Sequence, residues 1–195
     1  EGFAGANLTV DCSDLSDLMF YVTDGSTFTL SGFTFEKFQG ARMFGDRCFV
    51  SNFLTYDDYY ARTGDEYVSV TVADCVLDAM FAERGMIQLF GDLTLSKTVF
   101  QNSYQEEGLL NGSRQNFIWV ENGPLTMDQV DMTDVSGELV KVHIYAIDSD
   151  LTVTSSSFVR NSSFYFTMAQ NEKIATAFFD SVLIAENESV FLGLN

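Results

Sequence analysis

The chain has 195 residues, of which 46% are hydrophobic, so it can form one domain with a substantial core and is too apolar for a disordered segment. Its 28 acidic residues against 10 Lys and Arg give a formal net charge of −18, which disfavours nucleic acid and anionic membranes as partners. No apolar run approaches the roughly 18 residues of a spanning helix, so we expect no membrane insertion.

A short phrase of the form apolar-Thr-apolar recurs along the chain and predicts strands, because apolar and polar residues alternate in it. It is clearest at residues 93–102 and returns at residues 151–161. The copies in chain order, two of them weaker, are Leu8-Thr9-Val10, Phe28-Thr29-Leu30, Cys48-Phe49-Val50, Val70-Thr71-Val72, Leu93-Thr94-Leu95, Leu125-Thr126-Met127, Leu151-Thr152-Val153 and Thr176-Ala177-Phe178.

Another large apolar residue follows almost every one of these anchors at a distance of seven positions. These residues are Leu15, Phe35, Leu77, Phe100, Met132, Phe158 and Leu183, whereas the copy at Cys48 has Thr55. Successive anchors lie about 20 to 26 residues apart, with one interval of about 32. Such a short strand cannot bury its apolar face alone, so the copies must stack. The sequence therefore predicts an all-β solenoid of about eight coils, forming a single domain over residues 1–195.

The longest predicted coil begins at Leu93, and we expect its extra length in a loop insertion at residues 104–116. Such insertions gather on one face of a solenoid, which is often a binding face. Pro124, the only proline, directly precedes the Leu125 strand, where its missing N–H is tolerated.

Neither end of the predicted solenoid carries a recognisable cap. The first strand begins near Leu8, and residues 190–194 are apolar almost to the last residue. Open strand edges and exposed core side chains promote association. Two interpretations follow: the segment is excised from a longer β-helix, which the first residue Glu1 leaves open, or copies stack head to tail. Head-to-tail contacts that do not close produce a filament.

The repeated phrases resemble the right-handed parallel β-helix of the pectin-lyase-like superfamily. The resemblance covers nearly the whole chain and is carried by residues 28–38, 70–81, 93–102, 125–135 and 151–161. Phe158-Val159-Arg160-Asn161 is also similar to the Phe-x-x-Asn repeats of bacterial surface β-helices. This resemblance implies a right-handed parallel fold but no particular function, because the superfamily includes enzymes, adhesins, tail spikes and structural proteins.

Enzymes of this superfamily cleave acidic polysaccharides, so the resemblance directs attention to clustered carboxylates. Asp57 and Asp58, with Arg62 nearby, are weak catalytic candidates, and the hydrolase phrases Asn-Thr-Asp, Gly-His-Gly and Arg-Ile-Lys are absent from the sequence. His143, the only histidine, alternates with apolar residues and is expected on the outer face of a strand. We therefore predict no catalytic residues and favour a non-enzymatic protein.

Ligand binding has two further candidate features. Asp148-Ser149-Asp150 and the aspartates among residues 11–17 are candidates for Ca²⁺, but their spacing matches no calcium loop and predicts ordinary turns. Three tyrosines could stack on sugar rings, whereas Trp119 is expected in packing. The tyrosines are Tyr56, Tyr59 and Tyr60. No metal site is predicted, and the only groups considered as cofactors are Ca²⁺ and N-linked glycans.

Cysteines and sequons bear on the compartment. Cys12, Cys48 and Cys75 fit either one disulfide, Cys12–Cys48 or Cys48–Cys75, or three buried free thiols. In a eukaryote, the Asn-x-Ser/Thr sequons are expected to carry glycans. They begin at Asn7, Asn111, Asn161 and Asn187.

These features favour an extracellular or cell-surface structural glycoprotein, a subunit of a filament or appendage whose partner is itself. The alternatives are a carbohydrate-active or carbohydrate-binding protein, and an excised segment of a large adhesin.

Overall fold

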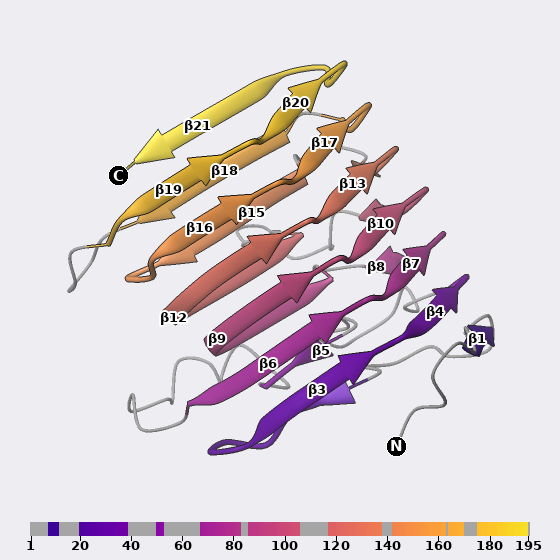
Figure 1. The fold of residues 1–195 in the computed structure, drawn as a ribbon, viewed down its shortest axis with the longest axis vertical. Helices are drawn as coiled ribbons and strands as arrows, with labels where there is room; N and C mark the ends of the chain where they lie inside the picture. The colour runs from indigo at the N-terminus through magenta and orange to yellow at the C-terminus, as the bar shows by residue number, and fades with distance from the viewer. Residues whose placement is uncertain are drawn as a thin grey trace, which may run out of the picture.

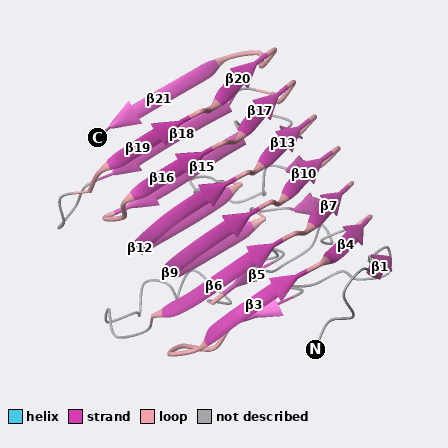
Figure 2. Cartoon of the chain, viewed as in Figure 1, coloured by secondary structure: helices cyan, strands magenta, loops and turns pink. Residues whose placement is uncertain are grey.

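The computed structural model describes residues 8–11, 20–38, 50–52, 67–82, 86–105, 117–137, 142–162, 164–169 and 175–194. Every regular element in this part of the chain is a β-strand, and all pairs of neighbouring strands are parallel (Figure 2). Within these ranges there is no helix and hence no helical membrane span. The all-β prediction is therefore confirmed for the described residues.

The strands form three sheets (Figure 1). The seven-stranded sheet has the order β1 (Leu8–Asp11), β4 (Phe33–Glu36), β7 (Val76–Asp78), β10 (Val99–Gln101), β13 (Asp131–Thr133), β17 (Ser157–Val159) and β20 (Leu183–Ala185). A three-stranded sheet contains β8 (Phe81–Ala82), β11 (Tyr104–Gln105) and β14 (Ser136–Gly137). Tyr104 and Gln105, predicted in the inserted loop, thus belong to a strand, and residues 106–116 lie outside the described ranges.

The eleven-stranded sheet consists of two rows that share the long strands β9 (Ile87–Ser96) and β12 (Ile118–Asp128). The leading row adds β2 (Phe20–Tyr21), β5 (Val50–Ser51), β15 (Val142–Ile147), β18 (Phe164–Ala169) and β21 (Val190–Leu194). The anchor row adds β3 (Thr27–Ser31), β6 (Val68–Ala73), β16 (Leu151–Thr154) and β19 (Ala177–Asp180). From β2 onward the chain visits the leading row, the anchor row and the seven-stranded sheet in turn, and in three of the repeats it then passes through the three-stranded sheet before it returns to the leading row.

The predicted repeat places equivalent residues side by side. Leu125 pairs with Leu93 on one side and with Leu151 on the other, and Val70 pairs with Phe28 and Leu93. The apolar residues seven positions later are buried and pair in series across the seven-stranded sheet, which confirms that part of the pattern. They are Phe35, Leu77, Phe100, Met132 and Phe158.

Two predicted anchors lie in other rows. Leu8-Thr9-Val10 pairs with Phe33-Thr34-Phe35 in the seven-stranded sheet, and Val50 belongs to the leading row between Phe20 and Ile87. The same apolar-Thr-apolar triplet therefore occurs in more than one row, and the triplet alone does not identify the row. Leu15, predicted to follow the first anchor, lies outside the described ranges.

The last anchor was predicted one residue too early. Leu151 pairs with Ala177 rather than Thr176, and Phe158 accordingly pairs with Ile184 rather than Leu183. A slip of one residue exchanges the two faces of a strand. Leu183, predicted in the core, is consequently 55% exposed. Six anchors, not eight, lie side by side in the anchor row.

The core lies between the rows, and alternate side chains of the anchor row and of the seven-stranded sheet enter it; in the leading row, by contrast, consecutive residues 87–91 and 118–120 are buried. In β6, for example, Val68, Val70 and Val72 are fully buried while the residues between them are partly exposed. Aromatic rings add edge-to-face contacts, such as Phe100 with Phe117 at 5.6 Å between centroids. Complete burial of each such Val or Phe side chain stabilises the fold by about 1.5–3 kcal/mol.

Residues with positive φ turn the chain just before and just after each strand of the seven-stranded sheet, and in successive repeats they form two columns. One column follows the anchor row and includes Lys97, Gln129 and Ser155, and the other follows the seven-stranded sheet and includes Asn102 and Asp134. Each donates its N–H to the next repeat, as Gln129 N does to Thr154 O at 3.0 Å. Left-handed backbone costs about 1–2 kcal/mol per non-glycine residue, so these repeated hydrogen bonds help offset that strain.

A glycine pair bends β9 and β12 where the leading row meets the anchor row. Gly91 has φ +142°, and a Cβ there would lie 2.1 Å from the carbonyl oxygen of Val68. A Cβ on Gly123 would lie 2.3 Å from the carbonyl carbon of Gly91, so the two backbones are in close contact. Pro124 lies inside β12 at this irregularity, where the strand register shifts and a proline is tolerated.

Candidate functional site

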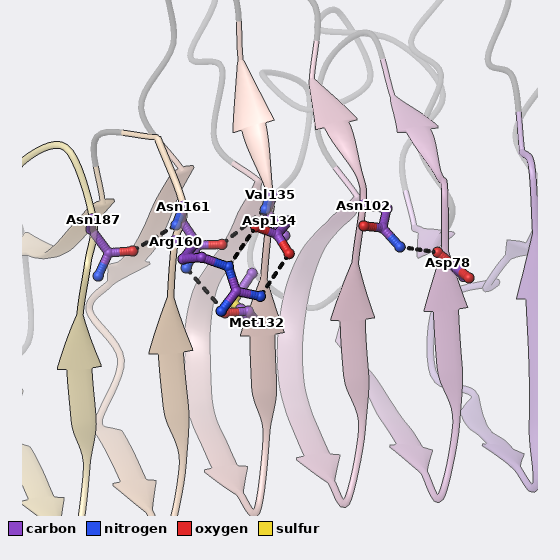
Figure 3. Close-up of polar contacts among 8 residues, drawn as sticks. All are labelled: Asp78, Asn102, Met132, Asp134, Val135, Arg160, Asn161 and Asn187. Atoms are coloured by element: carbon purple, nitrogen blue, oxygen red, sulfur yellow. Dashed lines mark hydrogen bonds and ion pairs between the residues drawn. The ribbon is translucent and has the colours of Figure 1, made fainter.

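A ladder of asparagine side chains lines the corner that follows the seven-stranded sheet (Figure 3). Asn161 is 2% exposed; its Oδ1 accepts from Val135 N at 3.0 Å, and its Nδ2 donates to Met132 O at 3.1 Å. Asn187 repeats this arrangement in the next repeat, with Oδ1 accepting from Asn161 N at 2.8 Å and Nδ2 donating to Phe158 O at 2.9 Å. Each amide therefore satisfies two backbone groups of the preceding repeat.

This geometry bears on the prediction that Asn161 and Asn187 carry glycans. An N-linked glycan replaces one of the two hydrogens of Nδ2, so the hydrogen bond that Nδ2 donates in each residue does not by itself exclude a glycan, and the one at the half-buried Asn187 stays a prediction. The folded chain, by contrast, leaves Asn161 almost no exposed surface, which conflicts with a glycan at that residue. The missed sequence signal is that the two asparagines are 26 residues apart, the same interval that separates Leu125 from Leu151. Asn7 and Asn111 lie outside the described ranges.

Charged and polar groups form a second, exposed line along the same corner. Arg160 donates to both carboxylate oxygens of Asp134, at 3.0 and 2.9 Å, and Asn102 donates to Asp78 at 2.8 Å. The hydrogen bond from Arg160 holds the pKa of Asp134 below its usual value. Because both partners are exposed, such contacts contribute little to stability, with a median of about 0–1 kcal/mol.

The acidic turns proposed for Ca²⁺ are used in hydrogen bonds of the fold. Asp150 Oδ1 accepts from Thr176 N at 2.7 Å and from its hydroxyl at 2.8 Å, and these bonds lower the pKa of Asp150. Asp11 forms an ion pair with Lys37 at 3.5 Å. Within the described ranges, no group of three or more His, Cys, Asp or Glu side chains could hold a metal ion.

In three repeats a small side chain with a hydrogen-bond donor occupies the buried position after the first column of positive-φ residues, whereas Val130 occupies it in another. Cys75 is a free thiol, fully buried, whose Sγ donates to Ala73 O at 3.2 Å. Thr98 and Ser156 form the same bond to the residue two positions before them, at 3.0 and 2.7 Å. Burial raises the pKa of Cys75. The free thiol of Cys75 does not support the predicted Cys48–Cys75 pairing, whereas Cys12–Cys48 stays a prediction because both residues lie outside the described ranges.

Most of the candidate catalytic and sugar-binding residues lie outside the part of the chain that the structure describes. Asp57, Asp58 and Arg62 lie outside the described ranges, as do the three tyrosines near them. His143 lies on β15, where its backbone pairs with Tyr165. Trp119 is 1% exposed, which confirms its predicted role in packing.

Exposed apolar side chains concentrate at the ends of the sheets. Nine large ones are exposed among the described residues, and six of these lie on the last three strands: Phe178, Phe179, Leu183, Val190, Phe191 and Leu192. Two more, Leu8 and Tyr21, lie on the first two strands. A cavity of about 170 Å³ opens at the C-terminal end between Leu151, Phe166, Met168, Phe179 and Leu192. The interior is therefore open where the last repeat ends.

The asparagine corner can hold the fold together, and the open apolar end can bind another apolar surface. Neither presents a constellation of catalytic groups within the described ranges. Comparisons of the chain with protein-family models, with curated proteins and with solved structures found no match.

Proposed function

We propose that this chain is a non-enzymatic structural subunit, a single right-handed parallel β-helix whose copies stack end to end into a filament or surface appendage. The observation that carries the proposal is the concentration of exposed apolar side chains on the terminal strands. Eight of the nine in the described ranges are on β1, β2 and β19 to β21.

The helical arrangement is supported by the way consecutive strands pair. The strands β15, β16 and β17 follow one another along the chain, and each pairs in parallel with the strand three places later: β18, β19 and β20. A chain that returns to the same three rows in the same order traces coils around a common interior. Parallel crossovers are right-handed in about 98% of cases, which gives the handedness.

End-to-end stacking is supported by the unpaired edges of the last strands. In the described ranges β19, β20 and β21 each have a partner on one side only. Such an edge offers a row of free N–H and C=O groups that can pair with another strand. The apolar side chains beside these edges would be buried by the same contact, so hydrogen bonding and burial favour the same neighbour.

The proposed setting is extracellular or cell-surface, with Asn7, Asn111 and the half-buried Asn187 as candidate glycan sites. Protein purified from a secreting eukaryotic host should lose mass on glycosidase treatment, and single Gln variants assign the sites. Unchanged mass would remove the glycoprotein part of the proposal and leave stacking untouched.

Stacking is tested by electron microscopy and by light scattering coupled to size-exclusion chromatography over a range of protein concentrations. We expect short rods to lengthen as concentration rises. Leu192→Asp places a charge on the open apolar end and should shorten or abolish the rods. Ser136→Asp adds the same charge at an exposed position away from both ends and should leave them unchanged. A monodisperse monomer at high concentration would refute the proposal.

A further inference from the structure

We propose that two stacked copies share one coil of the helix: β20 and β21 of one copy pair with β1 and β2 of the next. This inference rests on the proposed end-to-end stacking and specifies its partner strands and register. It predicts one contact among the many that could join two apolar ends.

The two ends are stepped, and the steps are complementary. At the N-terminal end, β1 extends the seven-stranded sheet beyond β4, whereas β2 ends the leading row. At the C-terminal end, β21 extends the leading row beyond β18, whereas β20 ends the seven-stranded sheet. In a head-to-tail stack of the described strands, each projecting strand would therefore meet the recess left by the shorter row of the next copy. Two C-terminal ends placed together would oppose projection to projection and would pair their strands antiparallel.

The register follows from extending the existing ladders by one rung. In the seven-stranded sheet, Val10 holds the same place as Phe35, and Ile184 the same place as Phe158. The pairing of β7, β10 and β13 shows that Phe35 and Phe158 occupy the same position along their strands, so Val10 of the next copy should lie beside Ile184. Thr9 then lies beside Leu183.

The leading row gives a second, independent rung. Phe20 holds the same place as Val50 and Ile87, and Leu192 the same place as Phe166 and Ile144. Because β12 connects the two halves of this row, Phe20 of the next copy should lie beside Leu192.

Side-chain chemistry is compatible with these rungs. Phe20 is only partly buried and packs against Phe28, with ring centroids 5.2 Å apart, so an aromatic pair would meet the open cavity beside Leu192. No rung opposes two carboxylates, since Asp11 meets Ala185 and Tyr21 meets Gly193. The net charge of −18 therefore does not place two acidic side chains opposite each other at this contact.

The proposal rests on four strands only. The shared coil also has a position in the anchor row, between β19 of one copy and β3 of the next, and no described residue fills it. The sequence has Phe3 seven positions before Val10, the spacing that separates Leu151 from Phe158, but residues 1–7 lie outside the described ranges.

Engineered cysteines test the register. Leu183 and Thr9 are both exposed, and neighbouring strands lie about 4.8 Å apart, within the range of Cα separations of disulfides. The variant with Leu183→Cys and Thr9→Cys should therefore form covalent ladders under mild oxidation, seen on a non-reducing gel. Within one copy, β1 and β20 are six strands apart, or about 29 Å, so the bond cannot close internally.

A register control uses the same donor with a displaced acceptor. In Leu183→Cys with Asp11→Cys the two Cα atoms would be about 8 Å apart, beyond the reach of a disulfide, so ladders should be at least tenfold weaker. Peptide mass spectrometry distinguishes the engineered bond from bonds to the native cysteines.

The outcomes separate the two proposals. Rods without the Thr9–Leu183 bond, or equal cross-linking of both variants, would overturn the register and leave stacking intact. The absence of any association would overturn both.

Discussion

Replacing Asn161 by alanine tests whether the asparagine ladder holds successive repeats together. The substitution removes the acceptor of the Val135 N–H and the donor to the Met132 carbonyl. Both backbone groups lie in the interior, since Val135 and Met132 are fully buried, and the methyl group of alanine offers neither a replacement. Water can reach the site only through the void that the amide leaves.

The size of the effect follows from these two orphaned groups. A buried backbone group without a partner costs about 1–3 kcal/mol, so the two groups left by Asn161→Ala should destabilise the fold by about 2–6 kcal/mol. Asn187→Ala removes two equivalent bonds at a half-buried position, where water can replace them in part, and should cost about 1–2 kcal/mol. Asn102→Ala removes one exposed bond to Asp78 and places alanine at φ +50°, which asparagine tolerates better, so it should cost about 1 kcal/mol.

Urea unfolding followed by the fluorescence of Trp119, the single and buried tryptophan, measures all three. Ser163→Ala is the matched control, because it destroys the sequon at Asn161 and leaves both amide bonds in place. We expect it to unfold like the parent protein. If Asn161→Ala unfolds within about 0.5 kcal/mol of the parent, the ladder is not a stabilising element. If Ser163→Ala destabilises only protein from a glycosylating host, a glycan and not the buried amide is responsible.

Three further predictions concern the bend, the acidic turns and the buried thiol. Gly91→Ala should lower the free energy of unfolding by more than about 3 kcal/mol, because the new Cβ would overlap a backbone carbonyl. Gly25→Ala has open space around the new Cβ and should lower it only by the left-handed strain of about 1–2 kcal/mol. The urea midpoints of the two variants measure this difference. The pKa is lowered in the folded chain for three carboxyl groups: Asp128, Asp134 and Asp150. Protonation of these groups then favours the unfolded chain, so the stability that they contribute is present above the ordinary pKa near 3.8 and is lost as the pH falls below it. A urea midpoint that keeps rising from pH 4 to pH 3 would contradict this prediction. Cys75 should resist alkylation in the native protein and react in urea without reductant, whereas no reaction in urea would indicate a disulfide.

The strand positions that the sequence predicts correctly are those fixed by two apolar residues at once. Val70 and Leu77, or Leu125 and Met132, satisfy the seven-residue spacing in only one frame, and both members are buried. The last repeat satisfies it in two frames, because Ala177 and Ile184 fit as well as Thr176 and Leu183. Pairing energy across the sheet, which no single phrase contains, selects one of them.

The corner asparagines show a different limit. A three-residue sequon at Asn161 is a complete glycosylation signal when considered alone, and nothing in it reveals that the side chain points inward. The repeat does contain that information, since Ser103, Val135, Asn161 and Asn187 hold equivalent places and three of them bond backbone groups of the preceding repeat. A motif that recurs at the period of the structural repeat is better explained by its place in the repeat than by the function usually assigned to the motif.

Stacking has to overcome the net charge of −18 on each copy, and this fixes its dependence on salt. At about 0.01 M ionic strength the screening length is about 30 Å, comparable with the length of a subunit, whereas at about 0.15 M it is about 8 Å. The proposed rungs contain no ion pair, because their one charged residue, Asp11, faces Ala185; added salt therefore weakens the repulsion between copies and removes no ion pair from the contact. We therefore expect rods to lengthen between these two salt concentrations, measured by light scattering at constant protein concentration. Shortening on addition of salt would show that charge pairing joins the copies, which the apolar contact between β20, β21 and the next copy does not allow.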